Sequence, residues 1–122
     1  MEYNVETIKL FDTWWSSLTE SEQIDIDAVI TVLKQKGPLL PFPYSSGVEQ
    51  SKYSHMRELR IQHKGKPYRI LYAFDPRRVA ILLLGGDKTG DKRWYDTYVP
   101  IADKVYAEHL EYVERKKKGT KQ

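Results

Sequence analysis

The stretch Met56–Tyr98, MRELRIQHKGKPYRILYAFDPRRVAILLLGGDKTGDKRWYDTY, decides the fold because it predicts consecutive β-strands joined by tight turns. Residues 57–62 alternate polar and apolar side chains, which is the pattern of a strand with one buried face. Residues 68–74 are rich in β-favouring side chains and follow the polar turn 63–67. Together these segments predict an antiparallel hairpin.

A third strand is predicted after the connection Asp75–Arg78, which places proline at the second position of a turn. The continuous apolar run Val79–Leu84 is typical of a central strand covered on both faces. Gly85–Gly86 is expected to end it. The three strands therefore predict a small, mainly antiparallel, twisted sheet.

Two helices are predicted before this sheet, after a short first strand at Tyr3–Glu6. The first helix has one apolar face, formed by Ile8, Phe11, Trp14, Trp15 and Leu18. The second begins after Thr19, because Glu22 completes a capping box, and Gly37–Pro38 stops it. The short turn between the helices predicts a helical hairpin packed on the sheet.

The remaining segments complete one α+β domain covering residues 1–122. Residues 38–54 hold three prolines and a Ser-Ser-Gly, so we expect an irregular connection. The side chains expected to pack this connection on the core are Leu39, Leu40, Phe42 and Tyr44. The spacing of apolar residues over 98–113 predicts a C-terminal helix with Pro100 in its first turn, followed by a frayed basic tail at 115–122.

The composition excludes several classes of protein. The 122 residues are 40% hydrophobic and 30% charged, which is typical of one globular domain and not of a disordered chain. No cysteine is present, so disulfides, thiolate metal sites and a cysteine nucleophile are impossible. We expect no metal or other cofactor, since no His-x-x-x-His pattern or acidic cluster has metal-site spacing. Without a signal core or an apolar run of about 20 residues, a soluble cytoplasmic protein with no membrane association is expected.

Positive charge is concentrated in the predicted sheet. Residues 52–93 hold eleven Lys and Arg against four acids, a balance of +7. Residues 1–51 hold three Lys and eight acids, a balance of −5, and the last 29 residues have a net charge of +1. A basic middle after an acidic front favours a polyanion as partner, nucleic acid above all.

Arg60 and Arg69 lie on neighbouring strands of the predicted hairpin. If both project to the same side, the sheet presents two guanidinium groups suited to bidentate phosphate contact. Arg69 shares its face with apolar side chains, so it needs either a ligand or a partner. A salt bridge between Arg69 and Glu58 across the strands is the structural alternative.

The loop after the last strand, GDKTGDKRWY at residues 86–95, combines cations with aromatic side chains. Aromatic faces stack on bases while Lys and Arg hold phosphates, so this mixture favours RNA or another single-stranded nucleic acid. The glycine spacing is not that of a phosphate-binding P-loop. His63, in the turn before the second strand, is a candidate general base, although a single histidine in a polar turn is more often solvated.

Four segments of the chain resemble the RelE/HigB family of type II toxin–antitoxin toxins, and more narrowly its phage-derived, HigB-like branch. They are Met56–Arg60, Tyr68–Tyr72, Gly86–Thr89 and Arg93–Tyr95. The resemblance covers nearly the whole domain and implies the RelE-like fold of the RelE/ParE superfamily. It also implies a ribosome-dependent mRNA endoribonuclease, an mRNA interferase that inhibits translation until a cognate antitoxin neutralises it. Such enzymes use no metal: the ribose 2′-hydroxyl attacks the adjacent phosphate while cations hold the developing charge.

Carried over to this sequence, the resemblance implies a set of site residues. Catalytic roles are implied for Arg69, Arg60, Lys88, Arg93 and one of the two tyrosines Tyr95 and Tyr98. The other basic and aromatic residues expected to bind RNA are Arg57, His63, Lys64, Lys66, Lys92 and Trp94. Glu58 departs from the pattern, because it stands where the best-known members have a lysine as general base. A glutamate could act as the base but would oppose RNA binding, for which His63, Lys64 or Lys66 of the adjacent turn is left to compensate.

Two alternative functions stay open, and the resemblance also implies which partners the protein has. ParE-like, gyrase-inhibiting toxins share the fold, and a non-catalytic module would use the same basic face to dock RNA or a protein. The expected partners are a small helix-turn-helix antitoxin of HigA type, mRNA and the ribosome. DNA would be contacted only through the complex with the antitoxin.

Overall fold

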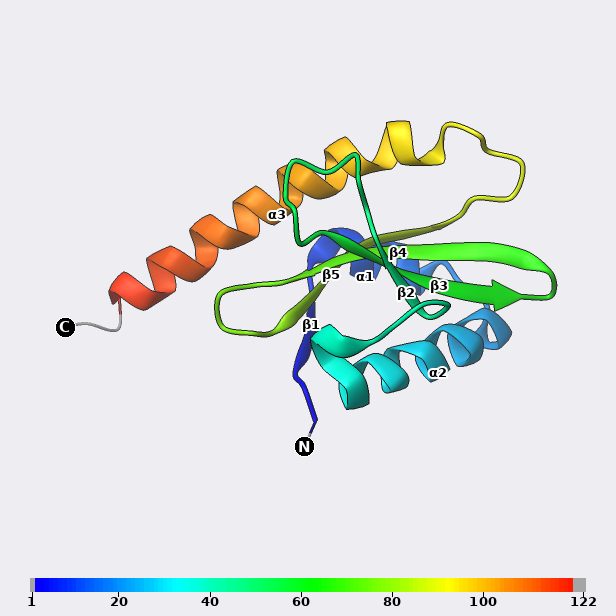
Figure 1. Ribbon diagram of the computed structural model, residues 1–122, viewed down its shortest axis with the longest axis horizontal. Helices are drawn as coiled ribbons and strands as arrows, with labels where there is room; N and C mark the ends of the chain where they lie inside the picture. The colour runs from blue at the N-terminus through cyan, green and yellow to red at the C-terminus, as the bar shows by residue number, and fades with distance from the viewer. Residues whose placement is uncertain (1, 120–122) are drawn as a thin grey trace.

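A five-stranded sheet carries helices on both faces in the computed structural model, which describes residues 2–119 (Figure 1). The elements in chain order are β1 (Val5–Thr7), α1 (Lys9–Ser16), α2 (Glu20–Lys36), the short 3₁₀ helix η1 (Gly37–Leu39), β2 (Ser45–Gly47), β3 (Arg57–His63), β4 (Lys66–Phe74), β5 (Ala80–Asp87) and α3 (Trp94–Gly119). Within this part of the chain, no helix has the length and apolar character that crossing a membrane requires.

The strands lie in the order β1-β5-β4-β3-β2. Only β1 and β5 pair in parallel, and the other three pairings are antiparallel. The helical hairpin of α1 and α2 covers one face of the sheet, and α3 crosses the other face (Figure 1). The predicted α+β class, a helical hairpin on a mainly antiparallel sheet with a C-terminal helix, is confirmed.

Two apolar cores result from this layering, one on each face of the sheet. The core beneath the helical hairpin includes Phe11, Ile26, Leu33, Leu59, Ile70 and Tyr72. The core beneath α3 includes Met56, Leu71, Ile81, Leu83, Trp94 and Tyr106. Successive residues of β4 and β5 point to opposite faces, so these two strands supply both cores. The prediction of a central strand covered on both sides is confirmed for Val79–Leu84.

The strand β5 continues through Gly85 and Gly86, so the prediction that these glycines end it is wrong. An added Cβ at Gly85 would lie 2.3 Å from the Trp14 ring, and one at Gly86 would lie 2.8 Å from the Trp94 indole nitrogen. The two tryptophans therefore pack against opposite faces of one strand at adjacent residues. Glycine is needed there for close approach of the indole rings and not for a turn.

The helix α3 starts at Trp94, four residues earlier than predicted, so Pro100 lies inside the helix and not in its first turn. Burial of the Trp94 ring fixes this start, and the Asp91 carboxylate accepts a hydrogen bond from the Arg93 amide just before it, at 3.0 Å. The predicted basic tail at 115–122 is helical as far as Gly119, and its last three residues lie outside the described part of the chain.

The connection between α2 and β3 contains a strand that the sequence did not predict. The edge strand β2 pairs with β3, with Ser46 opposite Glu58. Of the four apolar side chains expected to pack on the core, only Leu40 is buried; the others, Leu39, Phe42 and Tyr44, are exposed. The second half of the connection is fixed to α3, because the Asp103 carboxylate accepts hydrogen bonds from the Ser51 hydroxyl and the Lys52 amide.

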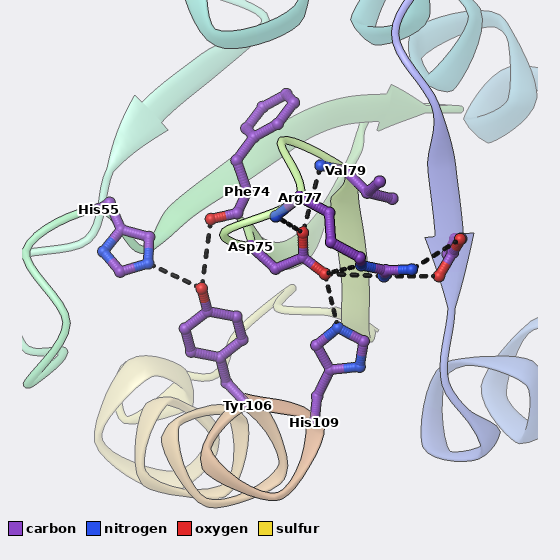
Figure 2. A network of polar contacts seen from close by, with 8 residues as sticks. His55, Phe74, Asp75, Arg77, Val79, Tyr106 and His109 are labelled. Atoms are coloured by element: carbon purple, nitrogen blue, oxygen red, sulfur yellow. Dashed lines mark hydrogen bonds and ion pairs between the residues drawn. The ribbon is translucent and has the colours of Figure 1, made fainter. Parts of the chain in front are cut away.

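A buried carboxylate, Asp75, joins the β4–β5 turn to α3 and β1 (Figure 2). It accepts hydrogen bonds from the Arg77 guanidinium at 2.7 Å and from His109 Nε2 at 2.9 Å. It also accepts hydrogen bonds from the backbone amides of Arg77 and Val79. Arg77 in turn bonds Glu6 of β1 at 2.9 Å. Burial acts to raise the pKa of Asp75, but the hydrogen bonds from Arg77, His109 and the two amides outweigh it, so the pKa is lowered.

The first testable consequence concerns the two close-packed glycines. We expect Gly85→Ala and Gly86→Ala each to lower the free energy of unfolding by about 1–3 kcal/mol, because the added methyl group displaces an indole ring. Denaturant unfolding measures the change. Gly47→Ala is the matched control in a strand, since its Cβ would meet only the Arg57 side chain at 3.9 Å. Equal unfolding free energies for Gly85→Ala and Gly47→Ala would contradict the packing account.

The second consequence concerns acid stability. Because the folded protein lowers the pKa of Asp75, this carboxylate stabilises the fold above its ordinary pKa of about 4, and the contribution is lost as pH falls below that value. We expect Asp75→Ala to cost about 3 kcal/mol at pH 7 by leaving buried donors unpaired. The variant should then lose less further stability than the wild-type chain between pH 5 and pH 2. Parallel acid profiles for the two proteins would show that Asp75 does not contribute in this way.

Candidate functional site

The Glu58 carboxylate is the centre of the candidate site, although only 5% of the residue is exposed. It projects from β3 toward the face of the sheet that α3 covers. Its Oε2 accepts hydrogen bonds from the Ser46 hydroxyl at 2.6 Å and from Arg60 Nη1 at 3.2 Å. Its Oε1 accepts a hydrogen bond from the Tyr95 hydroxyl at 2.5 Å. A buried carboxylate requires such partners, and here they come from β2, β3 and α3.

Arg69 on β4 is directly opposite Arg60 on β3, so both arginines project to the same side of the sheet, which the sequence had left open. The proposed salt bridge is present as well: Arg69 Nε lies 3.6 Å from Glu58 Oε1. That distance is too long for a hydrogen bond, so the buried Nε–H has no hydrogen-bond acceptor among the described residues. A buried guanidinium with an unsatisfied donor is suited to an anion that approaches more closely than Glu58 does.

The loop between β5 and α3 adds a third cation to this group. The ammonium of Lys88 lies over the Tyr95 ring, 5.8 Å from its centre. The loop is held in place, because the Lys88 amide donates to the Pro67 carbonyl at 3.0 Å and Asp87 accepts hydrogen bonds from Thr89. Lys88 is therefore held beside the phenol that contacts Glu58.

Tyr95 and Glu58 form a proton donor and a proton acceptor in contact. Burial raises the pKa of Tyr95, and the hydrogen bond to Glu58 and its charge raise it further, while Arg69 acts in the opposite direction. The phenol therefore stays protonated at neutral pH and can donate a proton, which is the role of a general acid. Three cations against one carboxylate leave the cluster with a net positive charge.

The structure brings together four of the residues implied to be catalytic, namely Arg60, Arg69, Lys88 and Tyr95. Tyr98 packs on the Trp94 ring, with 5.1 Å between ring centres, and not on Glu58. Arg93 is exposed in the loop before α3. Only Tyr95 of the two tyrosines therefore contacts the Glu58 cluster.

Three residues expected to bind RNA are buried or lie on the face of the sheet opposite the Glu58 cluster. Trp94 is 2% exposed because its ring fills the core against β5. His63 is buried at the end of β3, where its Nδ1 lies 2.6 Å from Asp25 of α2, so it is not a solvated turn residue. Arg57 projects to the opposite face from Glu58 and donates to the Ser45 hydroxyl. Alternation along β3 explains the placement of Arg57, since adjacent residues point to opposite faces.

The other predicted cations stay available at the surface. Lys64 and Lys66 flank the β3–β4 turn, and Lys92 lies in the loop before α3; all three are exposed. Because Tyr68 pairs with Asp87, this turn and this loop lie at the same end of the sheet (Figure 1). Lys64, Lys66 and Lys92 form a basic rim at this end of the sheet.

Glu58 departs from the family pattern, yet it is the side chain on which the cluster converges in the structure. Alternation along the predicted strand puts Glu58 and Arg60 on one face, and this was the sequence feature that could have indicated their contact. Ser46 was missed altogether, because nothing in a Ser-Ser-Gly segment predicts an edge strand. The register between β2 and β3 that places Ser46 opposite Glu58 is set by tertiary contacts.

Comparison with known proteins identifies the family of the chain. Residues 13–107 match the family described as phage-derived protein Gp49-like. The chain is 45% identical over 93 residues to the proposed toxin HigB3 of Mycobacterium tuberculosis, covering 75% of this chain and 80% of HigB3. It is 38% identical over 105 residues to the proposed toxin HigB2 of the same organism, covering 84% of this chain and about half of HigB2 (52%).

Solved structures show the same fold at low sequence identity. The archaeal RelE–RelB complex from Pyrococcus horikoshii matches with a TM-score of 0.54 and 16% identity, over 74% of this chain and 99% of that one. The predicted RelE-like fold is thus confirmed. With the family match and the similarity to HigB3, the chain belongs to the Gp49/HigB-like toxin family.

Proposed function

We propose that this HigB-like toxin is an endoribonuclease that cleaves mRNA on the ribosome and thereby inhibits translation. The observation that carries the proposal is the contact between the Glu58 carboxylate and the protonated Tyr95 phenol, with Arg60, Arg69 and Lys88 around them. An acceptor, a donor and surrounding cations are the groups that cleavage by an internal 2′-hydroxyl requires.

The proposed reaction transfers two protons and breaks one bond. Glu58 accepts the proton of the ribose 2′-hydroxyl as its oxygen attacks the adjacent phosphorus. The phosphorane carries extra negative charge, which Arg60 and Lys88 stabilise. Tyr95 donates its proton to the departing 5′-oxygen, so the products end in a 2′,3′-cyclic phosphate and a 5′-hydroxyl. Glu58 thus supplies the base that the family resemblance had left unassigned.

Access to the site favours Arg60 as the arginine that contacts the phosphate first. Its side chain is 29% exposed, whereas that of Arg69 is 7% exposed. Arg69 then holds the Glu58 carboxylate in place and adds positive charge from beneath the surface. The exposed cations Lys64, Lys66 and Lys92 would bind the RNA backbone without regard to sequence.

The same basic face suits neutralisation by an antitoxin. A related toxin was crystallised as a RelE–RelB complex, which supports a cognate antitoxin for this chain. A helix-turn-helix antitoxin of HigA type that covers Arg60 and the basic rim would exclude mRNA. Contact with DNA would then pass through the antitoxin.

The central test separates Tyr95 from Tyr98. After induction, we expect wild-type protein to stop growth and to generate new mRNA ends. Tyr95→Phe should lower the cleavage rate about 10²-fold or more, because it removes the proton donor and keeps the ring. Tyr98→Phe tests the alternative tyrosine. Tyr112→Phe is the matched control, because Tyr112 is half-exposed and should not affect cleavage. Growth arrest with DNA damage and intact mRNA would instead indicate a gyrase-inhibiting toxin.

A second test concerns the carboxylate and its arginines. We expect Glu58→Gln to lower cleavage about 10²- to 10³-fold, since the amide keeps the hydrogen-bond acceptor but cannot take a proton. Arg60→Ala should weaken cleavage, and it should lower thermal stability less than Arg69→Ala does, because the Arg60 side chain is the more exposed of the two. Arg69→Ala will also destabilise the domain, because it leaves Glu58 buried with fewer partners. Toxicity that persists in the Arg60→Ala, Glu58→Gln double variant would remove this cluster as the catalytic site.

A further inference from the structure

The loop before β2 presents a large aromatic side chain to solvent beside the candidate site. Phe42 is 68% exposed, and it is one of three exposed apolar side chains in this segment, with Leu39 and Tyr44. Single exposed apolar residues are ordinary, but three in six residues form a local patch. The sequence had predicted that these side chains pack on the core.

The Phe42 ring is in contact with the cation that reaches Glu58. The Arg60 guanidinium carbon lies 4.9 Å from the centre of the Phe42 ring. The same guanidinium bonds Glu58 Oε2 at 3.2 Å through its Nη1. Arg60 therefore joins the exposed ring to the buried cluster, and the ring lies one side chain away from the proposed reacting groups.

The backbone holds this ring in a defined place. Pro41 accepts hydrogen bonds from the amides of Tyr44 and Ser45, at 3.0 and 3.1 Å, which closes a turn around Phe42. The Tyr44 carbonyl accepts a hydrogen bond from the Arg60 amide at 2.9 Å, and Leu40 is buried at the other end of the turn. An exposed ring on a fixed turn loses little conformational entropy when a flat ligand stacks on it.

We propose that Phe42 is a stacking platform for one nucleobase of the RNA substrate, next to the phosphate that Arg60 contacts. Base–aromatic stacking tolerates any base, and a cation beside the ring suits the phosphate that follows the base. The inference rests on the proposed function and adds a base-binding position from a segment with no assigned role. A protein partner on the same ring is the competing occupant that the experiment must separate.

Binding of single-stranded RNA tests the platform apart from cleavage. The probe is a fluorescein-labelled 12-nucleotide RNA with 2′-O-methyl groups on every ribose, which cannot be cleaved because no 2′-hydroxyl remains. We expect Phe42→Ala to weaken binding about five- to hundredfold. Phe42→Trp should bind as well as wild type and show indole quenching by RNA. Leu39→Ala is the matched control, since Leu39 is 81% exposed in the same segment.

The salt dependence of binding separates stacking from charge. Phe42→Ala should leave the slope of log affinity against log salt unchanged, whereas Lys64→Ala should reduce its magnitude by about one. Wild-type affinity in Phe42→Ala together with weakened binding in Lys64→Ala would overturn the platform and leave RNA binding by the basic rim intact. Absence of RNA binding by the wild-type chain would overturn the platform, whereas the proposed function is tested separately by the mRNA ends formed after induction. Weakened antitoxin binding with unchanged RNA binding in Phe42→Ala would assign the ring to a protein partner and overturn the platform.

Discussion

The burial of one carboxylate, that of Glu58, is the constraint on which the candidate site depends. A charge removed from water must be paired, and the partners of Glu58 come from four elements: Ser46 on β2, Arg60 on β3, Arg69 on β4 and Tyr95 on α3. Satisfying this one group therefore fixes the edge strand, the central hairpin and the start of the last helix relative to one another. The group that organises the structure is also the group that we propose as the proton acceptor.

The long helix α3 is attached to the sheet at two places by different contacts. Its first turn carries Tyr95 to Glu58 and places Trp94 in the core. Further along, His109 bonds the buried Asp75 carboxylate, which also holds Arg77 and, through it, β1 (Figure 2). Two buried carboxylates thus fix the helix at separate places. The Asp75 network is a structural support for the arrangement in which the Glu58 cluster can act.

Local patterns in the sequence were enough to predict both N-terminal helices, the three long strands and the C-terminal helix. The capping box of Thr19 and Glu22 is present as predicted, and Arg60 and Arg69 lie on neighbouring antiparallel strands as predicted. Features set by contacts distant in sequence could not be predicted. Gly85 and Gly86 resembled a strand end because the tryptophans that need their space lie far away in the chain. For the same reason, β2 and the burial of His63 and Trp94 were missed.

The chemistry of the RNA ends tests the central claim most directly, because cleavage by an internal hydroxyl leaves a distinctive pair of termini. Fragments made by the wild-type chain should carry a 2′,3′-cyclic phosphate and a 5′-hydroxyl, and the same pair should be nearly absent with Tyr95→Phe at equal protein level and thermal stability. Fragments with 5′-phosphates, or cyclic phosphates formed equally by Tyr95→Phe, would contradict the assignment of Glu58 and Tyr95 as the proton acceptor and donor.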